Sequence, residues 1–326
     1  MNRRHFITLT AAGLGAPLPA CRKQSNVNAS GKPIIRLGHF PNITHVQALV
    51  AHQLSRQGRG WFEEKLGVEI EWCVYNAGPS ATEAIFAGAL DVTYVGPSPV
   101  LNAYAKSKGT EMRVLAGAAN GGAALVVRPD AGIEKPEDFR GKKIATPQLG
   151  NTQDVQARAW LMEHGFKITQ SGGDAFVIPT QNPDQLALFT KKELDAVWTV
   201  EPWVTRLELE AGAKIFLEDK ETSVTMLAAR AKWLEEQPDL AKKLTGAHRE
   251  LTAWIQAHPD ETKALVKAEL TDEKLPPKDP VLDRAISRVI VTPDVSRESL
   301  EKMVKSAQTA GFLKDIPALD KLLPGP

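Results

Sequence analysis

Hydroxyl and amide side chains recur in this sequence where an apolar segment ends and a helical segment begins. The residues concerned are Thr44, Ser80, Ser98, Asn151 and Thr152. The first N–H groups of a helix have no partner within the helix and lie at the positive end of its dipole. With a nearby hydroxyl or amide donor they form a site suited to an oxyanion, and no formal charge is needed. The simpler alternative is that each residue only caps its own helix.

The clearest example of this pattern lies between Lys142 and Trp160. Ile144 and Ala145 indicate a short strand, and the turn after it holds Pro147 and Gly150. A helix begins at Asn151, with Thr152 and Asp154 in its first turn. A strand, a small polar turn and a helix in direct succession predict an anion site at the turn.

The candidate metal ligands and nucleophile are few. His39, His45 and His52 are spaced by six and seven residues, whereas zinc ligands on one element are usually closer. His39 and His45 are better interpreted as hydrogen-bond donors at a cleft, or as ordinary surface residues. Cys73 would need an adjacent base to act as a nucleophile, and a partly buried strand cysteine is the simpler interpretation. No glycine-rich phosphate loop is present, so we predict binding rather than catalysis, with no cofactor and no metal.

Four aromatic residues lie at or just after predicted strand ends, namely Phe40, Tyr94, Trp198 and Trp203. They are placed either to line a pocket or to fill the core.

The elements that position these residues form two successive α/β units. In the first, strands are expected at 34–40, 68–75, 90–95 and 113–118, with helices between them. The second runs from about 127 to 217, with strands at 144–145, 175–178 and 194–198. Alternating strands and helices predict mostly parallel, buried sheets, with ligands bound outside the carboxyl ends of the strands. The remaining C-terminal part is predicted to be helical.

Length and charge narrow the function classes further. The chain has 326 residues, which favours two domains. Lys and Arg number 40 and Asp and Glu 39, so the formal net charge of +1 does not support nucleic-acid binding.

The N-terminal segment has the pattern of an export signal. Arg3-Arg4 precedes an apolar stretch, and Leu18-Pro19-Ala20-Cys21 resembles the lipobox of a bacterial lipoprotein. We expect residues 1–21 to be a twin-arginine-like signal, Cys21 to carry the lipid and residues 22–33 to be a flexible tether. Pro19 is unusual in a lipobox, so cleavage without lipidation is the alternative. The protein is then periplasmic or at the cell surface, and it contacts the membrane only through the lipid.

Six short sequences follow one another in a fixed order between about Ile34 and Arg230: Gly38-His39-Phe40-Pro41, Gly78-Pro79-Ser80, Gly96-Pro97-Ser98-Pro99, Phe139-Arg140-Gly141-Lys142-Lys143-Ile144-Ala145, Gly150-Asn151-Thr152 and Glu201-Pro202-Trp203. Together these motifs resemble one family, the substrate-binding proteins of nitrate, sulfonate and taurine ABC importers.

The resemblance implies an α/β type II periplasmic-binding fold, with two lobes, a central mostly parallel sheet in each and a cleft between them. We expect residues 34–124 and 220–326 to form the first lobe and 125–219 the second. By matching position, the ligand would be held by Ser80, Ser98, Asn151, Thr152, Phe40, Asn42, Thr44, Glu201 and Trp203. Trp198, His39 and His45 complete the predicted site.

The resulting prediction is an exported monomer, not an enzyme, that binds a small anionic solute and delivers it to the transmembrane subunits of an ABC permease. A sulfonate or a taurine-like compound is the favoured ligand. Glu201 either binds a ligand amine or only ends its strand, and His39 and His45 hint at an unusual ligand. The alternatives are nitrate, bicarbonate or another small solute, an enzyme on the same scaffold (a desulfinase or a pyrimidine-forming relative), and a sensing module.

Overall fold

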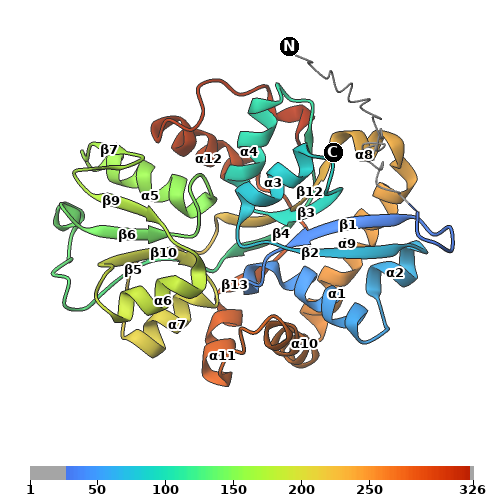
Figure 1. The fold of residues 1–326 in the computed structure, drawn as a ribbon, viewed down its shortest axis with the longest axis horizontal. Coiled ribbons are helices and arrows are strands. Elements are labelled where there is room, and N and C mark those ends of the chain that lie inside the picture. The colour runs from blue at the N-terminus through green and yellow to red at the C-terminus, as the bar shows by residue number, and fades with distance from the viewer. Residues whose placement is uncertain (1–26, 324–326) are drawn as a thin grey trace, which may run out of the picture.

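Two mixed β-sheets, one in each lobe, form the framework of the computed structural model, which describes residues 27–323 (Figure 1). The sheet of lobe 1 has six strands in the order β13-β4-β12-β3-β1-β2. They are β1 (Ile34–His39), β2 (Glu69–Val74), β3 (Val92–Val95), β4 (Met112–Gly121), β12 (Ser223–Arg230) and β13 (Val289–Val291). Lobe 1 is therefore built from two separate parts of the chain.

The sheet of lobe 2 has five strands in the order β11-β5-β10-β6-β9. They are β5 (Ala123–Val127), β6 (Lys143–Thr146), β9 (Phe176–Pro179), β10 (Ala196–Val200) and β11 (Lys214–Asp219). A small separate ribbon is formed by β7 (Ile168–Thr169) and β8 (Gly172–Gly173).

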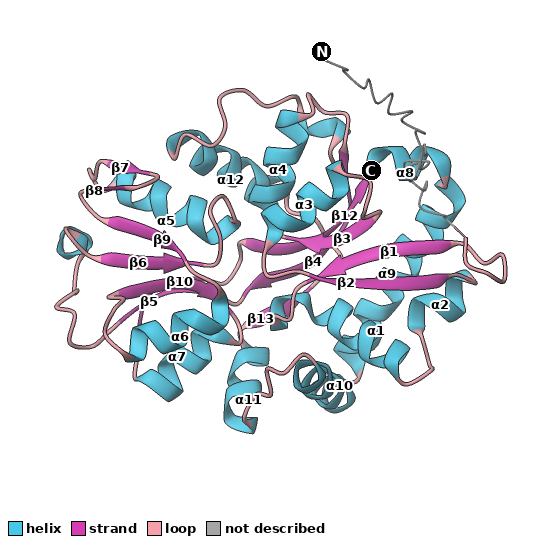
Figure 2. Ribbon diagram, in the orientation of Figure 1, coloured by secondary structure: helices cyan, strands magenta, loops and turns pink. Residues whose placement is uncertain are grey.

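Helices cover both faces of each sheet (Figure 2). One face of the first sheet packs on α1 (Val46–Arg56), α2 (Trp61–Leu66), α9 (Pro238–Ala257), α10 (Pro259–Asp272) and α11 (Asp279–Ser287). The other face packs on α3 (Gly78–Phe86), α4 (Pro97–Lys106) and α12 (Arg297–Thr309). In lobe 2, α5 (Thr152–Glu163) covers one face, and α6 (Asn182–Thr190) and α7 (Trp203–Ala211) cover the other. Short elements complete the chain: η1 (Ile43–His45), η2 (Pro136–Phe139), α8 (Ala231–Glu236) and η3 (Leu319–Lys321).

The sequence predicted mostly parallel sheets, whereas both sheets are mixed. In lobe 1, β1 runs parallel to β2 and β3, but β12 runs antiparallel to β3 and β4. In lobe 2, β6 runs parallel to β9 and β10, but β5 runs antiparallel to β10 and β11. The reason is that β12 and β5 carry the chain into a lobe from the other lobe. Each of them therefore runs opposite to the strands of its own lobe whose carboxyl ends face the other lobe.

The chain crosses between the sheets twice. The first crossing, between β4 and β5, is made by Gly121 and Gly122, whose φ angles are +68° and +70°. Residues 117–121 belong to β4, which reaches as far as the first of these glycines. Only glycine adopts positive φ angles without strain, so the reversal falls at the two adjacent glycines. The second crossing lies between β11 and β12, at residues 220–222.

Most predicted elements are present, with two differences. Helix α2 was not predicted. Residues 27–33, expected within the tether, form a turn in which Asn28 Nδ2 donates to Glu69 Oε2 at 2.7 Å.

The predicted signal and Cys21 lie outside the described residues. Within residues 27–323, no helix has the length and apolar character needed to cross a bilayer.

Candidate functional site

A cleft between the lobes lies at the carboxyl ends of several strands. Its cavity volume is about 30 Å³, so the lobes lie close together around a small space. Lobe 1 contributes Phe40, Asn42, Thr44, His45, Asn76, Ala77, Gly78, Gly96, Pro99 and Val224. Lobe 2 contributes Pro147, Asn151, Thr152, Gln153, Asn182 and Val200.

Four helices begin at this cleft. Helices α3 and α4 start after Ala77 and Gly96, which lack a side-chain cap, and both have proline in the first turn. Helix α6 starts at Asn182, also without a side-chain cap. Helix α5 starts after Asn151, whose Oδ1 accepts from the N–H of Asp154 at 2.9 Å. The positive ends of four helix dipoles therefore converge on one small space, which favours an anion.

The lining carries no formal charge. It contains no Asp, Glu, Lys or Arg residue. His45 is also neutral, because burial, and secondarily the charge of His39, hold its pKa well below the ordinary value. Its Nδ1 accepts from the N–H of Phe40 at 3.4 Å, which leaves Nε2 as a hydrogen-bond donor. Within residues 27–323, the hydroxyl of Thr44 makes no side-chain hydrogen bond, so it is available to a ligand.

The carboxamide of Asn42 links the two lobes at the cleft. Its Oδ1 accepts from Trp203 Nε1 at 3.1 Å and from Asn182 Nδ2 at 3.4 Å. Asn182 is held in turn by Thr199, whose Oγ1 donates to Asn182 Oδ1 at 3.2 Å. Trp203 thus acts through Asn42 and does not line the cleft itself.

The lobes also touch where α4 and α5 begin. Thr152 Oγ1 accepts from the N–H of Ser98 at 3.4 Å, and Ser98 Oγ donates to the carbonyl of Gly150 at 3.2 Å. A Cβ atom on Gly96 would lie 2.4 Å from Thr152 Oγ1. Glycine is therefore required at position 96 for the start of α4 to lie this close to Thr152.

The structure brings about half of the predicted site residues together. Phe40, Asn42, Thr44, His45, Asn151 and Thr152 line the cleft. Ser80 and Ser98 lie beside it and bridge the lobes, and Ser80 Oγ accepts from Gln148 Nε2 at 3.0 Å. Trp198 lines a separate hollow with Trp160.

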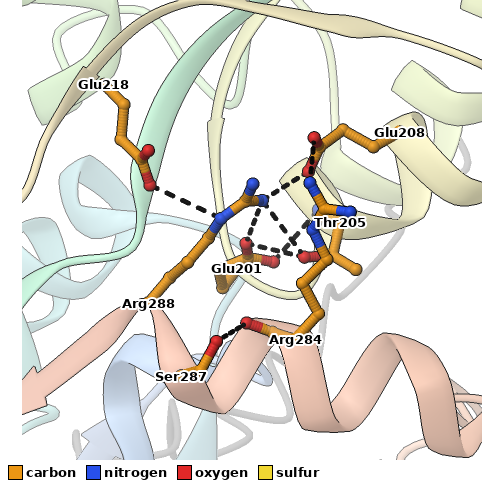
Figure 3. Close-up of polar contacts among 7 residues, drawn as sticks. All are labelled: Glu201, Thr205, Glu208, Glu218, Arg284, Ser287 and Arg288. Carbon is orange, nitrogen blue, oxygen red and sulfur yellow. Dashed lines mark hydrogen bonds and ion pairs between the residues drawn. The ribbon is translucent and has the colours of Figure 1, made fainter.

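Glu201 is placed to hold the lobes together, not to bind a ligand amine (Figure 3). Its carboxylate is fully buried and accepts from Thr205 N at 3.1 Å and Thr205 Oγ1 at 2.8 Å. Arg288 of lobe 1 donates to Glu201 Oε1 at 3.1 Å and also pairs with Glu208 and Glu218 of lobe 2. Burial raises the pKa of Glu201, opposed by the bonds from Thr205 and Arg288.

Two further candidates lie away from the cleft. The ring of His39 points into lobe 1, where Nε2 lies 3.0 Å from His52 Nδ1. Burial, and then the charge of His52, lower the pKa of His39 to about 3. Cys73 lies on β2, and burial, followed by the charge of Glu71, raises the pKa of its thiol, which disfavours the reactive thiolate.

Sequence reasoning missed several polar lining residues. Asn76 follows β2, Gln153 lies in the first turn of α5, and Asn182 is the first residue of α6. All three obey the rule used for the hydroxyl residues, that polar groups at strand ends and helix starts face the cleft. Applying that rule to every amide side chain would have found them.

Comparisons with known proteins agree with this geometry. A putative aliphatic sulfonates-binding protein of Bacillus subtilis (strain 168) is 26% identical over 229 residues, covering 68% of this chain and 67% of that protein. The taurine-binding periplasmic protein of Escherichia coli (strain K12) is 25% identical over 283 residues, covering 85% and 77%.

A solved structure, the alkanesulfonate-binding protein SsuA from Xanthomonas axonopodis pv. citri bound to MOPS, has a TM-score of 0.71 at 17% identity, covering 89% of this chain and 97% of that one. The periplasmic nitrate-binding protein NrtA from Synechocystis PCC 6803 has a TM-score of 0.66 at 16% identity, covering 86% and 82%. These likenesses confirm the predicted two-lobed α/β periplasmic-binding fold.

A family model described as the NMT1-like family matches residues 28–270. Since this match spans most of the chain, the protein belongs to the NMT1-like family.

Proposed function

We propose that the protein is the extracytoplasmic solute-binding protein of an ABC importer. Its cleft holds a small organic solute with an oxyanion headgroup, and a sulfonate or a taurine-like compound fits best. The protein delivers this solute to the permease subunits. It acts as a monomer at the periplasmic or outer surface of the membrane, with Cys21 as the lipid anchor.

The observation that carries the proposal is the convergence of four helix N-termini on an uncharged lining. Backbone N–H groups and the side chains of Thr44, Asn151 and Thr152 supply donors to the headgroup. A neutral lining stabilises an anion through dipoles, and it contributes no full charge that would bind a cation. The relatives named for aliphatic sulfonates and taurine support the same ligand class.

The apolar part of the lining favours an organic anion over nitrate or bicarbonate. Phe40, Pro99, Val200 and Val224 lie beside the polar groups. A bare inorganic anion has no apolar part to contact these side chains, whereas an alkyl or taurine body does.

Thermal unfolding of the purified protein against a panel of small anions tests the proposal. The panel contains taurine, alkanesulfonates, aryl sulfonates, sulfate, nitrate, bicarbonate, phosphonates and pyrimidines. A ligand that binds only the folded state, at 100 times its Kd, adds about 2.7 kcal/mol of stability and raises Tm by several degrees. We expect a sulfonate to do so in the unaltered protein.

Matched variants separate a cleft ligand from other binding. Thr152→Ala should abolish the rise in Tm, whereas Thr271→Ala, an exposed helical threonine far from the cleft, should retain it. A rise caused only by nitrate or bicarbonate would overturn the organic-ligand part of the proposal. A rise that Thr152→Ala leaves intact would place the ligand elsewhere.

A further inference from the structure

A cluster of three potential metal ligands lies inside lobe 1, outside the solute cleft. His39 ends β1, His52 lies in α1 and Glu269 lies in α10, and their exposed fractions are 0%, 8% and 0%. His39 Nε2 is 3.0 Å from His52 Nδ1, which is 2.7 Å from Glu269 Oε1. All three atoms lie within 4.8 Å of one another.

Too few N–H hydrogens are available to form hydrogen bonds between His39 Nε2, His52 Nδ1 and Glu269 Oε1. His39 Nδ1 lies 3.4 Å from the carbonyl of Phe40 and donates to it, so Nε2 carries a lone pair. His52 Nδ1 carries at most one hydrogen, which can point at His39 or at Glu269 but not at both. Glu269 Oε1 is buried, and although His52 Nδ1 lies 2.7 Å away, no donor among residues 27–323 has hydrogen-bond geometry toward it. A buried carboxylate oxygen without a donor costs free energy, so the geometry calls for a cation at the centre.

We propose that His39 Nε2, His52 Nδ1 and Glu269 Oε1 bind a divalent transition-metal ion, with Zn²⁺ as the best fit. Two imidazole nitrogens and one carboxylate oxygen form a ligand set that zinc prefers, and a water molecule would complete a tetrahedral shell. With metal–ligand bonds of about 2.0–2.1 Å, tetrahedral ligand atoms lie about 3.3 Å apart. The His39–His52 and His52–Glu269 pairs, at 3.0 and 2.7 Å, are shorter than this spacing and need to separate by only a few tenths of an ångström. His39 Nε2 and Glu269 Oε1 lie within 4.8 Å of each other, so the same ion needs these two atoms to settle at that spacing as well.

The surroundings orient the ligands as the outer shell of a metal site does. The carbonyl of Phe40 fixes the tautomer of His39, and the second oxygen of Glu269 accepts from Arg56 Nε at 3.1 Å. The ring of His52 stacks on Trp72, with centroids 4.8 Å apart and an interplanar angle of 15°.

Charge and access are also compatible with a cation. Arg56 pairs with Glu273 at 2.5 Å as well as with Glu269, so two carboxylates face one guanidinium. The side chains of Arg56 and Glu273 are 38% and 18% exposed, so the guanidinium that contacts Glu269 also reaches solvent. A bound ion would join β1, α1 and α10, and it would fix the strand end from which Phe40 and Asn42 enter the solute cleft.

Metal titration of the purified protein tests the inference directly. After treatment with a chelator and its removal, Zn²⁺ is added in competition with a chromophoric chelator. We expect one Zn²⁺ per chain and a rise in Tm. We also expect Co²⁺ to give the intense visible absorption of tetrahedral coordination. Weak octahedral absorption, or no stoichiometric uptake, would overturn the proposal.

Variants assign the site, and a matched control is available. His52→Gln and Glu269→Gln should each abolish stoichiometric binding. His258→Gln should keep it, although His258 stacks on Trp254 in nearly the same way, at 4.7 Å and 14°. Uptake that survives both ligand variants would place the ion elsewhere and refute the assignment. If a variant fails to fold, the Co²⁺ absorption of the unaltered protein still decides the coordination.

Discussion

Arg288 of lobe 1 reaches across to lobe 2 and donates from Nη1 to the fully buried Glu201 Oε1 at 3.1 Å (Figure 3). The guanidinium also pairs with Glu208 and Glu218, so one cation of lobe 1 faces three carboxylates of lobe 2. This cluster lies outside the lining of the solute cleft. It therefore sets how the lobes are held relative to each other and leaves the ligand chemistry to uncharged groups.

Removing the guanidinium should destabilise the protein strongly. In Arg288→Met, Glu201 keeps its bonds from Thr205 but loses its charged partner while remaining buried, which costs about 3–5 kcal/mol. Arg284→Met is the matched control, because Arg284 pairs with the same Glu208 but its side chain is 45% exposed, and it should cost less than about 1 kcal/mol. Urea unfolding measures both. Equal losses of unfolding free energy in the two variants would show that the buried Arg288–Glu201 ion pair contributes no more stability than an exposed one.

Adding one methyl group at position 96 should hold the lobes apart. The new Cβ would lie 2.4 Å from Thr152 Oγ1 and 3.3 Å from the carbonyl of Val224. We expect Gly96→Ala to weaken binding of the panel compound that raises Tm by at least about tenfold. Gly246→Ala in α9 is the control, because within residues 27–323 its added Cβ would meet no atom within 4 Å outside its own turn of helix, and it should stabilise the helix by roughly 0.5–1 kcal/mol. Calorimetric titration that gives Gly96→Ala the affinity of the unaltered protein would contradict the close approach.

Placing a negative charge in the cleft tests the oxyanion directly. Asn151→Asp keeps an N-cap acceptor for the N–H of Asp154, so the helix should stay intact. The added carboxylate repels an anionic headgroup, and solute affinity should fall at least about tenfold. Ser296→Asp makes the same kind of change at the N-cap of α12 and should leave affinity unaltered. Binding that is unaffected by Asn151→Asp would mean that no anion sits at α5.

Strand-end reasoning located the cleft but did not fix the direction of each side chain. Asn42 and Asn151 face the cleft because they lie in the turns themselves. Trp198 lies before the end of β10 and packs near Trp160, with ring centroids 6.5 Å apart, while Val200 at the strand end reaches the cleft. Because side chains alternate between the two faces of a strand, the position of a residue along the strand determines whether its side chain lies in the cleft or in the core. The sequence does not give the end of a strand to within one residue, so it does not settle this choice.

Long-range pairings were beyond the sequence for a different reason. His39 and His52 share a cluster with Glu269, which comes from the C-terminal helices, and Arg288 pairs with Glu201 across the lobes. The antiparallel strands β5 and β12 likewise follow from how the chain returns between lobes. Such contacts depend on the tertiary path, which local periodicity does not encode.

His248 should make the protein sensitive to mild acid. Its Nε2 donates to the carbonyl of Gly117 at 2.8 Å, and its Nδ1 accepts from the hydroxyl of Tyr94 at 2.9 Å. Burial is the main cause that lowers the pKa of His248, to about 4, with the charge of Arg249 adding to it and the Gly117 bond opposing it.

The direction of the effect follows from which state binds the proton. In the unfolded chain a histidine has a pKa of about 6.5, so between pH 6.5 and about 4 the unfolded state holds a proton that the folded state lacks. This contribution to stability is complete above pH 6.5 and is lost as the pH falls, by about 1 kcal/mol per pH unit. His248→Gln can keep both hydrogen bonds but cannot titrate. The difference in unfolding free energy between the two proteins should therefore shift in favour of the variant from pH 6.5 to pH 4.5, measured by urea unfolding. A difference that stays constant over this range would show that His248 does not take up the proton on unfolding.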